Sequence, residues 1–252
     1  MTAPQPRISI LVATWNCAGL LVGLLASLTE QSWTDWELLL LDNASSDGTA
    51  ELVADHRHHH PWQQLRWSSC PDQGIYDAWN RGLAQARGDY ICCIGADDRF
   101  LGPGSLAAIA ELSVSGADLI TARNAYCGRD GRFLRHWGWP WTWRRMRQSM
   151  VIAHPGMLVK RSLFDRFGGF DASFRICGDY EWFLRLPPEL RSIHSSDPIL
   201  QVVQAGVSHS RIRQVYAETF RAQRRHLGWP LSAACWALNW LQYGRRRLIG
   251  LA

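Results

Sequence analysis

The sequence predicts an α/β fold in which a mostly parallel, Rossmann-like central sheet is flanked by helices. Residues 8–13 (ISILVA), 37–41 (ELLLL) and 90–94 (YICCI) are short, uninterrupted apolar runs, as is typical of strands buried on both faces. Between the first two runs, residues 19–31 carry leucines at helical spacing. A strand, a helix and a second strand in succession indicate parallel pairing, so we expect a parallel sheet.

Polar residues follow each of these strands. Residues 14–16 (TWN) come after the first, residues 42–49 (DNASSDGT) after the second, and Asp97 and Asp98 after the third. Ligands of an open α/β sheet bind in the crevice beyond the carboxyl ends of its strands, so we expect these clusters to share one crevice. Adjacent carboxylates repel unless a cation lies between them, and Mg²⁺ and Mn²⁺ bind carboxylates together with substrate phosphates. The pattern therefore predicts a metal-assisted phosphate site.

Length and composition are compatible with one sizeable domain. The chain has 252 residues, of which 47% are hydrophobic, enough for one core with an appended segment. No apolar run reaches the roughly 18–20 residues that span a bilayer, and the start, MTAPQPR, is too polar for a secretory signal. The seven cysteines show no C-x-x-C spacing, which favours reduced, mostly buried thiols. We expect a cytoplasmic protein.

The chain divides into three parts. We expect residues 1–98 to bind a donor ligand, 99–205 to complete the same domain, and 206–252 to form a helical, basic segment. Within that last segment, residues 211–227 and 231–249 both fit a helical register, with a break at 228–230. The histidine cluster at residues 55–60 (DHRHHH) is interpreted as a solvated helix end rather than a metal site, because adjacent histidines cannot all turn toward one ion.

The basic charge of the chain concentrates near its end. The formal net charge is +5, and arginines at residues 221–225 and 245–247 flank Trp229, Trp236 and Trp240. Tryptophan beside arginine is typical of a membrane interface and also of a single-stranded nucleic-acid groove. No nucleic-acid reader motif is present, so we expect no nucleic-acid partner.

The second helix of this basic segment supports two interpretations. It would align Leu231, Cys235, Leu238 and either Leu241 or Gln242 along one side. That side either contacts a membrane surface peripherally or packs against the catalytic domain.

Four ordered motifs identify a family. ISILVATWN, ELLLLDNASSDGT, DQGIYDAWNRGLAQARGDYI and GADD resemble the nucleotide-sugar-binding half of family 2 glycosyltransferases, which have the GT-A fold. The match is looser in HPGMLVKRSLFDRFGGFD (154–171) and GDYEWFLRL (178–186). The resemblance implies an inverting transfer from a nucleotide-diphosphate sugar, UDP-linked, to a glycan or polyprenyl-diphosphate-linked acceptor in bacterial surface-polysaccharide synthesis.

The resemblance also implies site residues. Asp97 and His209 would bind Mn²⁺ or Mg²⁺. Asp42 would accept a hydrogen bond from an imide N–H of the base; the alternative is that it only caps a turn. The donor-binding set is Thr14, Asn16, Asp42, Asn43, Asp72, Gly74, Tyr76, Asp77, Asn80 and Asp98.

The chain departs from the family at two of these positions. Trp79 stands where many relatives have an arginine, and Gly95 stands where they have a first aspartate. These departures motivate an alternative function, a non-catalytic nucleotide-sugar-binding or regulatory module.

The catalytic base is expected in the block GDYEWFLRL. By resemblance, Asp179 is the carboxylate that takes a proton from the acceptor hydroxyl, and Glu181 is the alternative. Residues two apart on a helix point in different directions, so we expect only one of them to face the site. An acidic first helical turn is also favourable in itself. His154 either contacts the acceptor or the diphosphate, or is structural.

Overall fold

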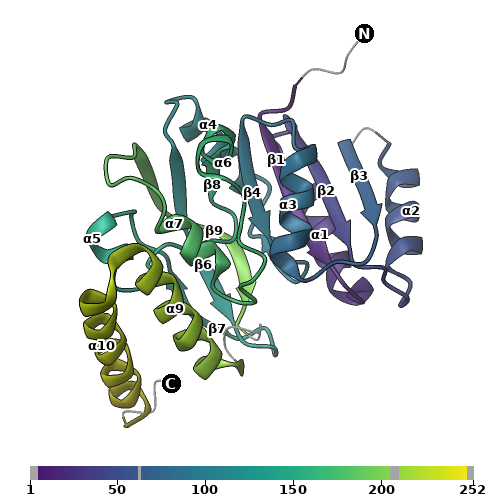
Figure 1. Ribbon diagram of the computed structural model, residues 1–252. Coiled ribbons are helices and arrows are strands. Elements are labelled where there is room, and N and C mark those ends of the chain that lie inside the picture. The colour runs from purple at the N-terminus through teal and green to yellow at the C-terminus, as the bar shows by residue number, and fades with distance from the viewer. Residues whose placement is uncertain (1–4, 62–63, 205–209, 249–252) are drawn as a thin grey trace.

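The computed structural model describes residues 5–61, 64–204 and 210–248 (Figure 1). The strands are β1 (Ile8–Thr14), β2 (Trp36–Asp42), β3 (Gln64–Ser69), β4 (Tyr90–Ile94), β5 (Arg99–Phe100), β6 (Leu119–Cys127), β7 (Phe133–Trp137), β8 (Leu158–Lys160) and β9 (Ser192–Val203). The helices are α1 (Ala18–Thr29), α2 (Thr49–His59), α3 (Ile75–Gln85), α4 (Ser105–Ser113), α5 (Trp143–Met146), α6 (Arg161–Phe167), α7 (Gly178–Phe183), α9 (Ile212–Leu227) and α10 (Trp229–Leu248).

One sheet runs through both halves of the described chain, in the order β3-β2-β1-β4-β8-β6-β9-β5, with β7 paired to β6. The first four strands in this order are parallel, and Thr14 pairs with Asp42 at their carboxyl ends. The remainder is mixed, because β8 runs antiparallel to both β4 and β6. The expected α/β fold is therefore confirmed: β3, β2, β1 and β4 are parallel in the first hundred residues, and in the second half β6 and β9 also pair in parallel.

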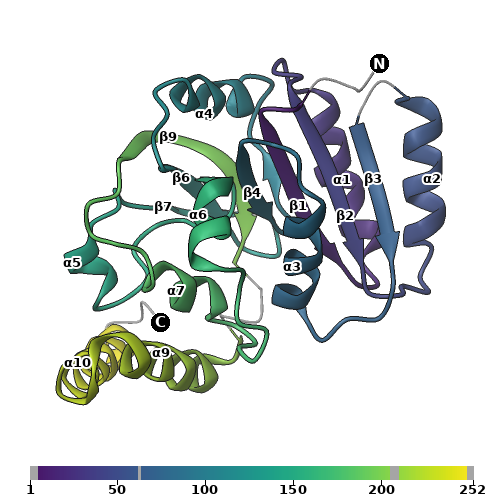
Figure 2. The ribbon, with the colours of Figure 1, turned by 45° about the horizontal axis from the view of Figure 1, so that its top comes forward.

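Helices cover both faces of the sheet, and β1 shows why its sequence is uninterruptedly apolar. Ile8, Ile10 and Val12 pack with α1 and α4, whereas Leu11 packs with α3 on the opposite face. Successive side chains of a strand point to opposite faces, so both sets must be apolar. Figure 2 shows α1 and α3 on the two sides of the parallel strands.

The C-terminal helices α9 and α10 lie at the end of the molecule remote from β3 and α2 (Figures 1 and 2). They match the two helices expected there, and Pro230 is accepted in the first turn of α10, where no helical N–H is needed. The residues of the expected stripe on α10 differ in burial. Cys235 is buried, whereas Leu231, Leu238 and Leu241 are exposed.

Two further features of the described chain concern its cysteines and the length of its helices. All seven cysteines lie in the described residues, and each is a free thiol. Within those residues, no helix combines the length and apolar character that crossing a membrane requires.

Candidate active site

A buried carboxylate organises the carboxyl ends of β1 and β2. Asp42 Oδ1 accepts hydrogen bonds from the hydroxyls of Thr14 and Ser45, and Oδ2 accepts from the Ser45 amide at 2.8 Å and the Ser69 hydroxyl at 2.6 Å. Burial alone would raise the pKa of Asp42, but these donors lower it below its usual range. Four donors occupy the acceptor positions of this carboxylate. We therefore infer that Asp42 holds together the loops at the ends of β1, β2 and β3, which we call the donor wall, instead of hydrogen-bonding a nucleotide base.

Two asparagines, Asn16 and Asn43, add hydrogen bonds to neighbouring loops of the donor wall. The carbonyl oxygen of Asn16 accepts from the Ser46 amide at 2.9 Å, and that of Asn43 accepts from the Asp72 amide at 2.8 Å. In the described part of the chain, neither side-chain amide nitrogen has a hydrogen-bond partner, which leaves two donors available to a ligand.

The loop before α3 is shaped by its own polar side chains. Asp72 accepts from the Gly74 amide and forms an ion pair with Arg81 at 3.2 Å, and Asp77 accepts from the Gln73 amide. Gly74 has φ of 121°, a conformation that side chains disfavour. The predicted loop residues Asp72, Gly74 and Asp77 thus lie together.

Tyr76 and Asn80, which were expected beside the nucleotide, form hydrogen bonds with other parts of the protein. The Tyr76 hydroxyl lies 2.6 Å from the Ile176 carbonyl and 3.1 Å from Asp179 Oδ1. Asn80 exchanges two 2.8 Å hydrogen bonds with the backbone of Phe170. Tyr76 therefore lies beside the expected base, and Asn80 ties α3 to the turn that precedes α7, so neither side chain is placed as a nucleotide contact.

Trp79 explains one departure from the family pattern. It is buried in an aromatic cluster, with its ring centroid 5.3 Å from that of His154 and 5.5 Å from that of Phe170. An arginine in this apolar setting would be an unpaired buried charge, which is costly. Trp79 therefore contributes to the hydrophobic core of this protein.

The two aspartates after β4 differ in burial. Asp97 is half-buried, whereas Asp98 is buried and accepts a 2.7 Å hydrogen bond from the Gly95 amide. Burial, and then the charge of Asp97, raise the pKa of Asp98 to about 8. A side chain at Gly95 would begin 2.8 Å from Asp97 Oδ1 and 3.1 Å from Asp98 Oδ2. The glycine therefore leaves room for the carboxylate pair.

This pair fits a hard divalent cation in part. A buried carboxylate held near a second negative charge is stabilised by a cation, and carboxylate oxygens suit Mn²⁺ and Mg²⁺. Among the described residues, no group of three or more His, Cys, Asp or Glu side chains is arranged to hold a metal. The expected ligand His209 lies outside the described residues. Phosphate oxygens of a donor would have to complete the coordination.

Asp179 lies in the first turn of α7 with a partly exposed carboxylate. Oδ1 accepts from its neighbour's amide and lies near Tyr76, while Oδ2 lies 3.9 Å from His154 Nδ1. Burial lowers the pKa of His154, against the opposing effect of Asp179, so the imidazole is neutral near pH 7. Asp179 Oδ2 has no hydrogen-bond partner within the described residues and is the oxygen available to an incoming hydroxyl.

Charge effects connect these carboxylates across the sheet. Burial raises the pKa of Tyr126, and the charges of Asp98 and of Asp179 raise it further. Burial likewise raises the pKa of Cys17, with contributions from the charges of Asp42 and Asp97. The parallel pairing of β1 with β2 and with β4 places the carboxyl ends of these strands at one edge of the sheet. The start of α7 is linked to β4 through the loop at residues 154–156, since the Gly156 amide donates to the Cys93 carbonyl and His154 lies 3.9 Å from Asp179.

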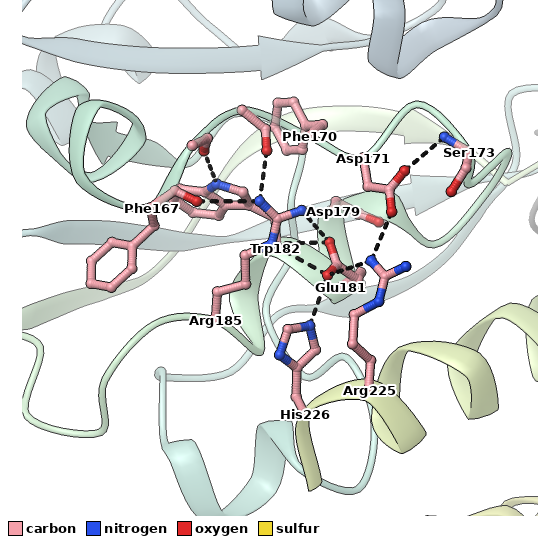
Figure 3. A network of polar contacts seen from close by, with 12 residues as sticks. Phe167, Phe170, Asp171, Ser173, Asp179, Glu181, Trp182, Arg185, Arg225 and His226 are labelled. Atoms are coloured by element: carbon pink, nitrogen blue, oxygen red, sulfur yellow. Dashed lines mark hydrogen bonds and ion pairs between the residues drawn. The ribbon is translucent and has the colours of Figure 1, made fainter. Parts of the chain in front are cut away.

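Glu181 lies in a different environment from Asp179. Its buried carboxylate binds Arg185, Arg225 and His226, the last at 2.7 Å (Figure 3). Hydrogen bonds from His226 and Arg185 overcome the opposing effect of burial and lower the pKa of Glu181 to about 2. A carboxylate engaged in this way is a poor proton acceptor, so the geometry favours Asp179 over the alternative base.

Sequence reasoning missed the partners of Asp179. Tyr76 is 103 residues away in the chain, and its hydroxyl gave no local signal. Glu218 was also missed, although it is the only acidic residue after residue 210. A lone carboxylate among arginines is the signal that would have drawn attention to it.

The fold and the carboxylates at its strand ends define a GT-A glycosyltransferase. Two solved structures share the fold. Staphylococcus aureus TarS, residues 1–349, has a TM-score of 0.70 at 20% identity, over 87% of this chain and 65% of that one. The mannosyltransferase PcManGT from Pyrobaculum calidifontis, in complex with GDP-Man and Mn²⁺, has a TM-score of 0.66 at 22% identity, over 92% and 74%. This chain thus spans slightly less than two thirds of the TarS fragment.

The chain belongs to glycosyl transferase family 2, whose sequence model matches residues 9–168. A PGL/p-HBAD biosynthesis glycosyltransferase of Mycobacterium bovis is 29% identical over 180 residues, 71% of this chain and 69% of that protein. Chondroitin synthase of Escherichia coli is 27% identical over 184 residues, 72% of this chain and 26% of that protein. The protein is therefore a glycosyltransferase.

Proposed function

We propose that the protein inverts the anomeric centre as it transfers a sugar from a UDP-linked donor to a hydroxyl of a glycan or a polyprenyl-diphosphate-linked acceptor. The pathway would be bacterial surface-polysaccharide synthesis. TarS has been solved with UDP-GlcNAc and PcManGT with GDP-Man and Mn²⁺, which supports a nucleotide-sugar donor. The observation that carries the proposal is the link between β4 and α7. Asp97 and Asp98 follow β4, the Cys93 carbonyl of β4 accepts a hydrogen bond from the Gly156 amide at 3.1 Å, and His154 of the same loop lies 3.9 Å from Asp179.

Asp179 is the proposed base. Displacement with inversion needs a carboxylate that takes the acceptor's proton as its oxygen attacks the anomeric carbon. Asp179 Oδ2 is partly exposed and lies beside a neutral His154, so it is placed to accept that proton. Tyr76 restrains the other oxygen of the carboxylate.

Asp97 and Asp98 would hold Mn²⁺ or Mg²⁺, with His209 as a proposed third ligand. The cation, when bound, offsets the charge of the diphosphate leaving group. On the donor side we propose that the side-chain amides of Asn16 and Asn43 donate to the base. These two asparagines belong to the donor wall, which the hydrogen bond between Thr14 and Asp42 holds together. They lie next to the loop that contains Asp72, Gly74 and Asp77.

A peripheral membrane position, at the cytoplasmic face, is part of the proposal. From residue 211 onward the sequence has eight arginines and a single acidic residue, Glu218. On α10, Leu231, Leu238 and Leu241 are exposed at helical spacing. Apolar side chains beside arginines are suited to an anionic lipid surface, where each arginine adds about 1 kcal/mol.

Titration of UDP by calorimetry, with and without Mn²⁺, tests the donor and metal parts. We expect Mn²⁺ to tighten UDP binding to the parent protein and to have a much smaller effect on Asp97→Asn. Equal enhancement in both would refute the metal assignment. Hydrolysis of a panel of UDP- and GDP-sugars with Mn²⁺ then separates an enzyme from a non-catalytic binding module, because only an enzyme turns them over.

A further inference from the structure

The segment that leads into α7 is anchored by a carboxylate from α9. The backbone amides of Arg175, Ile176 and Cys177 all donate to Glu218, the last two at 2.8 and 2.9 Å. Glu218 is buried, and although burial alone would raise its pKa, these amides and Gln214 lower it. Charge-assisted hydrogen bonds to three consecutive amides fix the path of the backbone immediately before α7.

This anchored segment controls the surroundings of Asp179. The carbonyl of Ile176 accepts the hydrogen bond from Tyr76, whose hydroxyl also approaches Asp179 Oδ1. Asp179 follows Cys177 by two residues. A displacement of residues 175–177 would therefore move both the carboxylate and the tyrosine that restrains it.

Helix α9 also holds the residues that follow Asp179. Gln223 donates to the Tyr180 hydroxyl at 3.1 Å, and His226 and Arg225 bind Glu181 (Figure 3). Glu218 and Gln223 are both buried, and with His226 they direct the contacts of α9 toward α7 and the segment before it. The chain is thus held on both sides of Asp179 by a helix that lies outside the family match at residues 9–168.

We propose that α9 sets the position of the catalytic carboxylate, with Glu218 as its principal positioning residue. This inference rests on the proposed role of Asp179 as base. Glu218 bonds to the backbone at residues 175–177 and reaches Asp179 through that backbone, while the Arg175 side chain separately donates to the Gln73 carbonyl. Its loss should therefore lower the rate of the chemical step and leave donor binding intact.

The test compares wild type, Glu218→Gln, Asp179→Asn and the double variant. The substrate is the nucleotide sugar that wild type hydrolyses fastest in a panel of UDP- and GDP-sugars with Mn²⁺. We expect Glu218→Gln to lower kcat by about 10- to 100-fold, since small misplacements of a catalytic group cost this much, with donor KM and UDP affinity unchanged. The double variant should be no slower than Asp179→Asn alone, because both changes remove the same contribution.

Two further variants keep the test decisive. Glu111→Gln, an exposed change on α4, is the matched control and should behave as wild type. Gln223→Met removes, at similar volume, the hydrogen bonds to the Tyr180 hydroxyl and to the carbonyls of Arg147 and Gln148. It decides the question if Glu218→Gln does not fold. Full turnover by Asp179→Asn would overturn the base assignment itself. If Asp179→Asn is slow, two results would overturn only the role of α9. One is an unchanged kcat in the folded Glu218→Gln or Gln223→Met variant. The other is a double variant in which the two effects multiply.

Discussion

Asp97 and Asp98 are neighbouring, identical side chains that differ in how deeply they are buried. Asp98 lies inside the protein and has a pKa of about 8, raised first by burial and then by the charge of Asp97. In the absence of a cation, the folded state thus holds a proton that the unfolded state releases near pH 4. This proton makes stability depend on pH at one identifiable position.

Asp98→Asn should therefore stabilise the metal-free protein. Between about pH 4 and pH 8 the native state binds more protons at Asp98 than the unfolded state, so this residue lowers stability as pH rises. The asparagine has no such dependence. Thermal melts in EDTA should show a gain that is larger at pH 8.5 than at pH 5.5, at about 2–4 °C for each kcal/mol. The exposed control Asp165→Asn should shift neither melt, and an equal gain at both pH values would contradict the raised pKa.

Glu181→Gln should have the opposite effect on stability. It removes the partner of three basic groups from a buried position, which costs about 3 kcal/mol. The pKa of Glu181 is lowered to about 2, so its contribution is complete above about pH 4.5 and is lost as pH falls toward 2. Urea unfolding at pH 7 and pH 2.5 should show the deficit at pH 7 only, with the exposed Glu51→Gln as control. A variant as stable as wild type at pH 7 would show that the ion cluster does not hold α9.

At the scale of elements, the sequence predicted the parts whose signals are local. The strands β1, β2 and β4 and helix α1 fall within two residues of their expected ends, because their apolar runs are uninterrupted. Strands β3 and β9 were missed; β3 carries polar side chains at four of its six positions, and β9 contains Pro198. Their pairing comes from neighbours that lie far away in the chain, which a local pattern does not record.

Some residues of the candidate site could likewise be predicted from the sequence, and others could not. Asp97 and Asp98 stand out because a carboxylate at a strand end is visible in the sequence, and Asp179 stands out through the family resemblance of its motif. The use of Tyr76 and Asn80 as links to the segments around Phe170 and Ile176 is not visible, because those contacts join residues 90 or more positions apart.

The exposed leucines of α10 carry a prediction at this scale. Replacing Leu231, Leu238 and Leu241 by glutamine should abolish sedimentation with phosphatidylglycerol vesicles at low salt, because the apolar contact is lost while the arginines remain. The fold should survive, since these side chains are exposed and the helix is held by Ser232, Cys235 and Asn239. Circular dichroism checks the fold.

Leu20→Gln provides the matched control for this prediction. Leu20 is 57% exposed on α1, at a distance from α10 in the fold. The vesicle binding of this variant should equal that of wild type. Wild-type protein that fails to sediment, or a triple variant that sediments normally, would remove the membrane proposal.

Over the whole molecule, one continuous sheet joins the donor side to the base side. The parallel strands β3-β2-β1-β4 bring the donor wall and Asp97 to one edge, and β4 continues through β8 into the half that carries α7. Helices α9 and α10 pack against that second half. Under the proposed function, metal, donor and base would thus be carried by one continuous sheet and the helix beside it, and catalysis would depend on a single carboxylate of α7.

The most direct test of that claim is single-turnover kinetics of Asp179→Asn with the best hydrolysed nucleotide sugar and Mn²⁺, beside calorimetric UDP binding. The account predicts a rate about 10²-fold or more below wild type, with UDP affinity unchanged, because the residue accepts a proton only in the transition state. A variant that binds UDP normally and reacts at the wild-type rate would show that Asp179 is not the base.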